Sequence, residues 1–414
     1  MAEKKFDIVV MGATGFTGRL VAEFLLQRHG ARGDLRWAVA GRSRERLEQV
    51  RAGLGDAASQ LPLVIADSHD RDSLDAMVAQ TSVVCTTVGP YALHGSELVA
   101  ACAAVGTDYC DLSGEVPWMH EMIDAHGQAA RASGARIVHC CGFDSIPSDL
   151  GVWFLQRAAL ERYGKPLARV RMRVKAAKGG LSGGTFASML NIVEESRRNP
   201  TTAKVLKNPY ALCPPDARKG PRQPYVSGPQ YDQVIGSWMA PFIMAAINTR
   251  VVHRANALQQ NAYGPDFRYD EAVLTGRGLG GRAKAVSLSL AMGGFALGAS
   301  LGPTRALLKK WALPKPGEGP NAAQREAGFF NILIHGSTAD DETLSVRVRG
   351  DRDPGYGSTS RMLGEAAVCL ARDLADESVP GGFWTPSTAL GSKLVERLRA
   401  NAGVTICLED SNSA

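Results

Sequence analysis

The sequence predicts an α/β fold, in which an N-terminal doubly wound parallel sheet of the Rossmann type is followed by a second, α+β domain. Three observations predict it: strands and helices alternate up to about residue 150, the first strand runs into a glycine-rich turn, and the pattern then changes. A chain of 414 residues is also too long for one compact core. We expect domains at 1–150 and 151–380, and a C-terminal helix and tail at 381–414.

The first strand, turn and helix predict a dinucleotide site. Residues 6–11, Phe-Asp-Ile-Val-Val-Met, have the pattern of a short, mainly apolar strand. Gly12-Ala-Thr-Gly-Phe-Thr-Gly18 follows at once, and a helix opens at Arg19. Glycine lets the backbone approach a pyrophosphate, and the helix N-terminus presents N–H groups to it. The alternative is an ordinary glycine-rich turn, which the position between a strand and a helix disfavours. The residues expected to contact the cofactor here are Gly12, Thr14, Gly15, Phe16, Thr17 and Gly18.

The second strand, at 36–40, indicates which cofactor is bound. An NAD-selective site places Asp or Glu near the end of this strand to hold the ribose 2′-OH. This chain has Arg42, Ser43 and Arg44 there instead. Because a guanidinium suits a 2′-phosphate, we predict NADP(H), held by Arg42 and Ser43. Arg44 either contacts the phosphate or only lies in solvent at the start of the following helix, and we give these two alternatives equal weight.

Four more strands complete the predicted sheet, and their carboxyl ends are where chemistry is expected. They lie at residues 63–67, 83–88, 109–112 and 136–141. Asp67 either accepts from the adenine amino group or caps the next helix, two equal alternatives. Thr87, Val88, Gly89 and Pro90 are expected beside the nicotinamide half. Asp149 is expected to have a structural role in its helix.

The second domain is predicted to be an antiparallel sheet with helices on one face. We expect strands at 169–177, 250–254, 329–335 and 343–349, and helices at 183–198, 283–310, 358–377 and 387–399. Residues 199–240 are rich in Pro, Gly and polar groups, so they are expected to form a long excursion.

Residues 285–304 contain no charge and are long enough to match a bilayer core. Four glycines and three serines moderate the hydrophobicity of this segment. Three interpretations stay open: a buried helix, which we favour, a hydrophobic hairpin that dips into one leaflet, and part of a tunnel for a long apolar substrate.

Composition sets limits on partners and on compartment. The chain carries 47 basic and 41 acidic residues, a net charge of +6. Without a dense basic run interleaved with aromatics, nucleic acid is not expected, whereas an anionic substrate or membrane surface would suit this charge. The eight cysteines form no C-x-x-C pair, so no metal is expected and a reducing compartment fits. Because no signal peptide precedes the first strand, we expect a cytoplasmic protein.

Several motifs together resemble the saccharopine dehydrogenase-like oxidoreductases, most closely their trans-acting enoyl reductase branch. The resemblance extends over nearly the whole chain. The motifs that carry it are the glycine turn, Ala40-Gly-Arg-Ser43, Thr87-Val-Gly-Pro-Tyr91, Gly106-Thr-Asp-Tyr109, Asp111-Leu-Ser-Gly-Glu115, Cys141-Gly-Phe-Asp-Ser-Ile-Pro-Ser-Asp149, Asn248-Thr-Arg250, Asn256-Ala-Leu258, Gly355-Tyr-Gly357 and Gly382-Phe-Trp-Thr-Pro386.

The resemblance implies an NADPH-dependent reduction of a carbon–carbon double bond. The implied substrate is a long-chain acyl or polyketide intermediate of (glyco)lipid synthesis, free or bound to a carrier protein, handled at or near the plasma membrane. The implied chemistry needs a hydrogen-bond and proton donor. Tyr91 is our preferred donor among the nearby phenols, which include Tyr109, and Asp144 and Ser145 are further catalytic candidates.

Three other functions stay open. The chain could be an imine reductase like saccharopine reductase, whose substrate would need clustered arginines, or an NADP-binding, lipid-associated protein without turnover. A purely structural Rossmann scaffold is disfavoured by Arg42. The sequence leaves the oligomeric state open, with a homodimer as one option.

Overall fold

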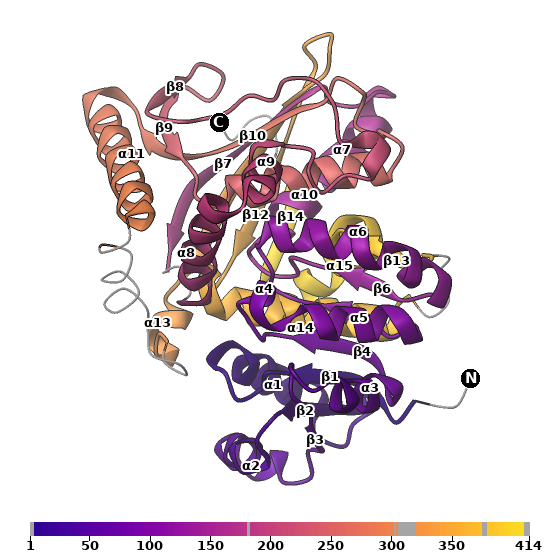
Figure 1. Cartoon of the computed structure of the whole chain (residues 1–414). Helices are drawn as coiled ribbons and strands as arrows, with labels where there is room; N and C mark the ends of the chain where they lie inside the picture. The colour runs from indigo at the N-terminus through magenta and orange to yellow at the C-terminus, as the bar shows by residue number, and fades with distance from the viewer. Residues whose placement is uncertain (1–3, 180–182, 302–303, 305–318, 375–378, 410–414) are drawn as a thin grey trace.

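The computed structural model describes residues 4–179, 183–301, 304, 319–374 and 379–409. Two seven-stranded sheets organise these residues (Figure 1). One cluster of buried apolar side chains extends from strand β1 (Phe6–Met11) through helix α7 (Ile146–Tyr163) to strand β12 (Thr343–Gly350) of the second sheet. The two sheets therefore share a continuous core.

The first sheet is parallel and doubly wound, as predicted, with the strand order β13-β6-β5-β4-β1-β2-β3. The order reverses between β1 and β4, which is where an open α/β sheet binds its ligand. Its strands are β1 (Phe6–Met11), β2 (Trp37–Gly41), β3 (Leu63–Ile65), β4 (Thr81–Thr86), β5 (Asp108–Cys110), β6 (Arg136–Val138) and β13 (Gly382–Trp384).

Helices cover both faces of the first sheet. The buried clusters place α1 (Phe16–His29), α2 (Arg44–Gly53) and α14 (Thr359–Arg372) on one face. They place α3 (Arg71–Ala79), α5 (Ser96–Val105) and α6 (Val116–Ser133) on the other. Helix α14 and strand β13 come from far along the chain, so the chain returns to the first sheet after building most of the second.

The second sheet is mixed, with the order β14-β12-β11-β7-β10-β9-β8. The predicted antiparallel arrangement is wrong at one pair, because β10 runs parallel to β7. The strands are β7 (Arg169–Lys178), β8 (Gln230–Asp232), β9 (Ser237–Pro241), β10 (Arg268–Gly276), β11 (Phe329–Ser337), β12 (Thr343–Gly350) and β14 (Val404–Leu408).

The strand predicted at 250–254 is wrong, because these residues lie in helix α10 (Ala245–Leu258). The buried Arg250 donates to the carbonyls of Ala246 and Leu206, and the buried Arg254 donates to those of Leu212 and Phe383. These contacts, with the burial of Val251 and Val252, outweigh the β preference of the valine pair. The predicted excursion at 199–240 contains α9 (Pro200–Lys207), β8 and β9.

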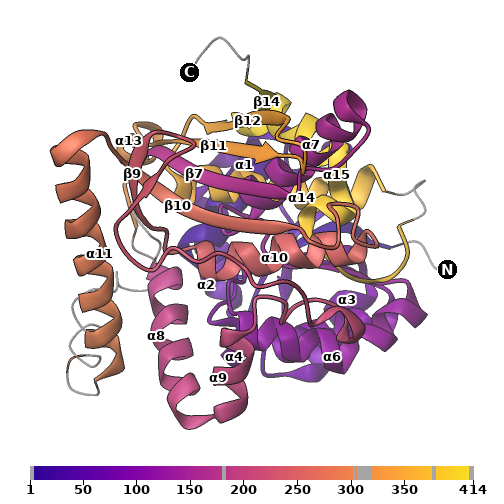
Figure 2. The ribbon, with the colours of Figure 1, turned by 90° about the horizontal axis from the view of Figure 1, so that it is seen from above.

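Residues 285–300 form most of α11 (Gly278–Ser300), a helix at the edge of the molecule in both views (Figures 1 and 2). The favoured interpretation of a buried helix is wrong for much of its surface, since Leu290 is 71% and Leu297 63% exposed. Residues 302–303 lie outside the described residues. No helix in the described part of the chain is both long and apolar enough to cross a membrane.

Candidate active site

At the glycine turn after β1, a ligand can approach the main chain closely. Gly12 has φ +90°, and a Cβ there would lie 2.7 Å from Cγ2 of Val88. A Cβ at Gly18 would lie 2.2 Å from the carbonyl oxygen of Gly12. Helix α1 begins at Phe16, after Gly15, and no side chain caps it. The turn is therefore closed to side chains and offers main-chain N–H groups, which fits a pyrophosphate.

The threonine and phenylalanine of this turn connect it to its surroundings. Thr14 places its methyl group towards Gly41 at the end of β2, and Thr17 is half-buried in the first turn of α1. Phe16 contacts Tyr356 edge-to-face, with ring centroids 4.9 Å apart, and the guanidinium of Arg325 lies over its ring. Phe16 therefore connects the turn to residues next to the second sheet in the chain, since Arg325 precedes β11 and Tyr356 follows β12.

The end of β2 presents an exposed cation and no acid. Arg42 is exposed and has no ion pair among the described residues, as a phosphate ligand requires. The Ser43 hydroxyl caps α2 by accepting from the N–H of Arg46 at 3.3 Å. Asp67 does not cap α3, which begins at Arg71 after Asp70. Its carboxylate accepts instead from the N–H of His69, so the adenine alternative stays a prediction.

Sequence reasoning missed a histidine pair at the same edge of the sheet. Nε2 of His69, in the loop after β3, lies 2.8 Å from Nδ1 of His94, at the end of helix α4 (Tyr91–His94). Burial, then His69 and Arg42, lower the pKa of His94. Two isolated histidines 25 positions apart give no signal in the sequence, because only the fold brings them together.

The loop after β4 lies directly against the glycine turn. Thr87 donates its N–H to the carbonyl of Met11 and its hydroxyl to that of Gly12, and Val88 packs on Gly12. Gly89 and Pro90 join through a cis peptide bond, and α4 begins at Tyr91. Thr87, Val88, Gly89 and Pro90 therefore lie at the switch point of the sheet, and their contact with the nicotinamide half stays a prediction.

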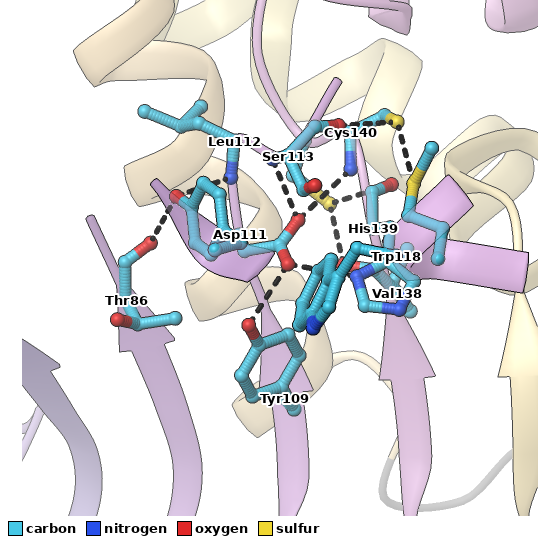
Figure 3. A network of polar contacts seen from close by, with 12 residues as sticks. Thr86, Tyr109, Asp111, Leu112, Ser113, Trp118, Val138, His139 and Cys140 are labelled. Atoms are coloured by element: carbon cyan, nitrogen blue, oxygen red, sulfur yellow. Dashed lines mark hydrogen bonds and ion pairs between the residues drawn. The ribbon is translucent and has the colours of Figure 1, made fainter. Parts of the chain in front are cut away.

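Asp111, at the end of β5, is the centre of a buried polar network (Figure 3). Its Oδ2 accepts from the Tyr109 hydroxyl at 2.8 Å and pairs with Nδ1 of His139 at 2.7 Å. Its Oδ1 accepts from the N–H groups of Ser113 and Cys140. Tyr109 is therefore committed to Asp111, and Asp111 shapes the loops that follow both β5 and β6.

Glu115 and Tyr91 connect neighbouring strand ends. The Glu115 carboxylate accepts from the N–H groups of Tyr91 and Ala92 and from the hydroxyl of Ser188, in helix α8 (Gly183–Arg198). The Tyr91 hydroxyl donates to the carbonyl of Thr86 and accepts from the N–H of Leu112. Burial and the nearby carboxylates, Asp111 first, raise the pKa of Tyr91 well above its usual value. This hydroxyl is thus occupied on both sides by backbone.

The Asp144 carboxyl group, unlike the Tyr91 hydroxyl, is not fully hydrogen-bonded within the described residues. It lies in the loop after β6, and its Oδ2 atom is buried with no hydrogen-bond partner among the described residues. Burial, with a smaller contribution from the charge of Asp111, raises the pKa of Asp144 to about 7. The loop after β6 therefore holds a carboxyl group whose pKa lies near neutrality.

Ser145 begins a hydrogen-bonded chain that leads into the second sheet. Its hydroxyl donates to Oδ1 of Asn248, whose amide donates to Oε2 of Glu271. The Tyr269 hydroxyl donates to the other oxygen of Glu271 at 2.6 Å. Burial raises the pKa of Glu271 to about 7. Sequence reasoning missed Glu271 and Tyr269, because it predicted no strand over residues 268–276, where β10 lies.

Asp149 accepts from the N–H and hydroxyl of Ser387, a structural role in the first turn of α7. The cysteines of the described chain are free thiols, all of them buried except Cys407. Among the described residues no group of His, Cys, Asp and Glu side chains could hold a metal ion.

Comparisons with known proteins agree with this geometry. The family model for the saccharopine dehydrogenase NADP binding domain matches residues 8–138. A Mycobacterium ulcerans protein named trans-acting enoyl reductase is 38% identical over 413 residues, which cover 96% of each chain. A Mycobacterium tuberculosis H37Rv protein named "putative trans-acting enoyl reductase" is 43% identical over 417 residues, which cover 97% of each chain.

The solved structures show the fold over the same span. Apo saccharopine dehydrogenase (L-Glu forming) from Saccharomyces cerevisiae aligns with a TM-score of 0.53 and 13% identity, covering 98% of this chain and 99% of that one. At this identity, the likeness describes the architecture alone.

The parallel sheet, the open glycine turn and the exposed Arg42 define an NADP(H)-binding oxidoreductase of the saccharopine dehydrogenase-like class. Within that class, the chain belongs to the trans-acting enoyl reductase family.

Arg42→Ala is expected to weaken NADPH binding roughly 10- to 100-fold and to leave NADH binding unchanged, because a charge-assisted hydrogen bond contributes about 1.5–3 kcal/mol. Titration calorimetry with both cofactors measures this preference. Arg46→Ala, at an exposed position in the first turn of α2, is the matched control. Equal losses for NADPH and NADH would contradict a 2′-phosphate contact.

Proposed function

We propose that this chain reduces the carbon–carbon double bond of an enoyl thioester with NADPH. The observation that carries the proposal is its similarity, over nearly the whole length, to proteins named trans-acting enoyl reductases. The site adds chemical support, since it combines an NADP(H) cradle with a protonatable carboxyl group at the nicotinamide side of the sheet.

When bound, NADPH supplies a hydride to the β-carbon of the enoyl thioester. The resulting enolate then needs one proton at its α-carbon. We assign this proton to the carboxyl group of Asp144, whose Oδ2 has no hydrogen-bond partner among the residues that the structure describes. Tyr91 is less suited to the role, because Thr86 and Leu112 occupy its hydroxyl. Asp111 and Glu115 act by holding the strand ends in place.

The arrangement of arginines supports enoyl over imine reduction. A saccharopine-like substrate carries several carboxylates and would need arginines available to bind them. Arg173 instead pairs with Asp232 and Asp270, and Arg347 pairs with Glu409. Arg250 and Arg254 donate to backbone carbonyls. These four cations are therefore already used within the protein.

The substrate we propose is a long-chain acyl or polyketide intermediate of lipid or glycolipid synthesis, presented on a carrier. Peripheral contact with a membrane goes with such a substrate, and the exposed leucines of α11 support it.

The test follows NADPH consumption at 340 nm with purified protein and a long-chain enoyl thioester. Acyl-dependent oxidation, with the saturated thioester found by mass spectrometry, is the expected result. Turnover with a 2-oxo acid and an amine instead would establish imine reduction. NADPH binding without turnover of either substrate would favour a non-catalytic, lipid-associated role.

A further inference from the structure

Helix α11 carries apolar residues on two opposite sides. One side packs inward, and its members are Gly281, Ala285, Leu288, Met292 and Ala299, all buried or half-buried. The other side is exposed: Leu279 is 83%, Val286 37%, Leu290 71% and Leu297 63% exposed. A helix of 23 residues has enough apolar surface for both sides, but the protein covers only one.

The exposed residues form one straight line, which we call the leucine stripe: Leu279, Val286, Leu290 and Leu297. Their spacings of seven, four and seven residues place them within about 40° of arc around the helix axis. Leu301, 49% exposed, follows directly after the helix. At about 1.5 Å per residue, the stripe is about 27 Å long. A surface this apolar and this extended indicates a docking site.

The charged residues of α11 and of the chain on either side of it are of one sign. Between Glu271 and Glu318 the sequence has no Asp or Glu, but it has seven Lys or Arg. Arg277, Arg282 and Lys284 lie at the exposed N-terminal part of α11. The other four, Arg305, Lys309, Lys310 and Lys315, lie outside the described residues.

A second copy of this chain fits the stripe poorly. A two-fold interface brings the same patch of each copy together. In a parallel pairing of the two helices, Arg277, Arg282 and Lys284 at the N-terminal end of one α11 would lie beside the same three residues of the other. Like charges at an interface oppose such pairing. A membrane with anionic lipid headgroups, by contrast, takes the leucines into its apolar interior and attracts the cations at its surface.

We propose that α11 is an interfacial anchor, which lies along a membrane that contains anionic lipids with its leucine stripe inserted among the acyl chains. The purpose of the anchor rests on the proposed function, because a lipid-linked acyl substrate would be met there. Its physical basis does not, since it follows from the exposure and charge of α11 alone.

Flotation with vesicles tests the proposal on the full chain. Wild-type protein is expected to bind phosphatidylcholine vesicles that contain phosphatidylglycerol and to bind pure phosphatidylcholine much more weakly. Leu290→Glu/Leu297→Glu is expected to lower the partition coefficient at least about 100-fold, since two apolar side chains no longer insert. Arg282→Gln/Lys284→Gln is expected to lower it about fivefold per cation removed.

The matched control is Val105→Glu/Leu160→Glu, which adds the same charge at exposed apolar positions outside the stripe. This variant is expected to bind vesicles almost as wild type does. NADPH affinity, measured for every variant, shows that each one is folded. Turnover of a short, soluble enoyl thioester reports separately on the proposed function, because it requires no membrane.

Two results would overturn the anchor. In the first, the stripe variant binds anionic vesicles as well as wild type does. In the second, wild type binds no vesicles and instead forms a dimer in sedimentation velocity that the stripe variant loses, which would assign the stripe to a second copy. Vesicle binding without any turnover would leave the anchor standing and contradict the reductase.

Discussion

Asp144→Asn is expected to lower kcat for enoyl reduction by about 10²- to 10⁴-fold, the usual contribution of a positioned proton donor. The amide has nearly the same shape as the carboxyl group but no proton of suitable acidity. Because Asp144 does not touch the glycine turn or Arg42, the Kd for NADPH is expected to stay unchanged. Stopped-flow absorbance and calorimetry measure the two quantities separately.

The pH profile provides an independent check on Asp144. The proton donor works in its protonated form, so activity is highest below the pKa of about 7 and falls as the pH rises through that value. Asp144→Asn is expected to lose this alkaline decline along with most of the rate.

Tyr91→Phe separates the two candidate donors. It removes the hydroxyl that connects Thr86 with Leu112, so the midpoint of thermal unfolding is expected to fall while the pH profile keeps its decline. A loss of 100-fold or more in kcat with Tyr91→Phe, together with an active Asp144→Asn, would make Tyr91 the donor.

Asp111→Ala is expected to lower the free energy of unfolding by about 3–5 kcal/mol, since it leaves buried partners of a charged group unpaired. The variant deprives Tyr109, His139 and two backbone N–H groups of their acceptor. Urea unfolding followed by circular dichroism measures the loss.

Two further variants serve as controls for the urea measurement. Asp111→Asn keeps an oxygen for the backbone N–H groups and is expected to be intermediate in stability. Asp75→Ala removes an exposed carboxylate paired with Arg71 and is expected to change the urea midpoint very little. A wild-type midpoint for Asp111→Ala would mean that water replaces the carboxylate.

The first sheet was predictable because its signals are local. Each apolar strand ends in glycine or polar residues and a helix follows, so six strands and the cofactor turn could be read in order. Strand β13 could not be, because three residues, Gly-Phe-Trp, carry no periodic pattern. Strand β10 was missed because its acids are stabilised by residues far away in the sequence: Asp270 pairs with Arg169 and Arg173, and Glu271 accepts from Asn248 and Tyr269.

The candidate site was predictable in its residues rather than in their roles. The sequence placed Tyr91, Asp144 and Ser145 at strand ends, but it could not show which polar groups are already hydrogen-bonded. The surroundings of helix α11 could not be predicted either. Its apolar composition shows that contact with water is unfavourable, but it does not show which neighbour covers the helix.

The return of the chain to its first sheet has a consequence during synthesis. Strand β6 ends at Val138, and its neighbour β13 begins at Gly382. At 5–20 residues per second, a ribosome needs on the order of 10–50 s to travel between them. For that time the edge of β6 and the face awaiting α14 stay uncovered on the nascent chain. A fragment that ends near residue 150 would stay in this state permanently, so we expect it to aggregate or recruit chaperones rather than to fold as a stable nucleotide-binding module.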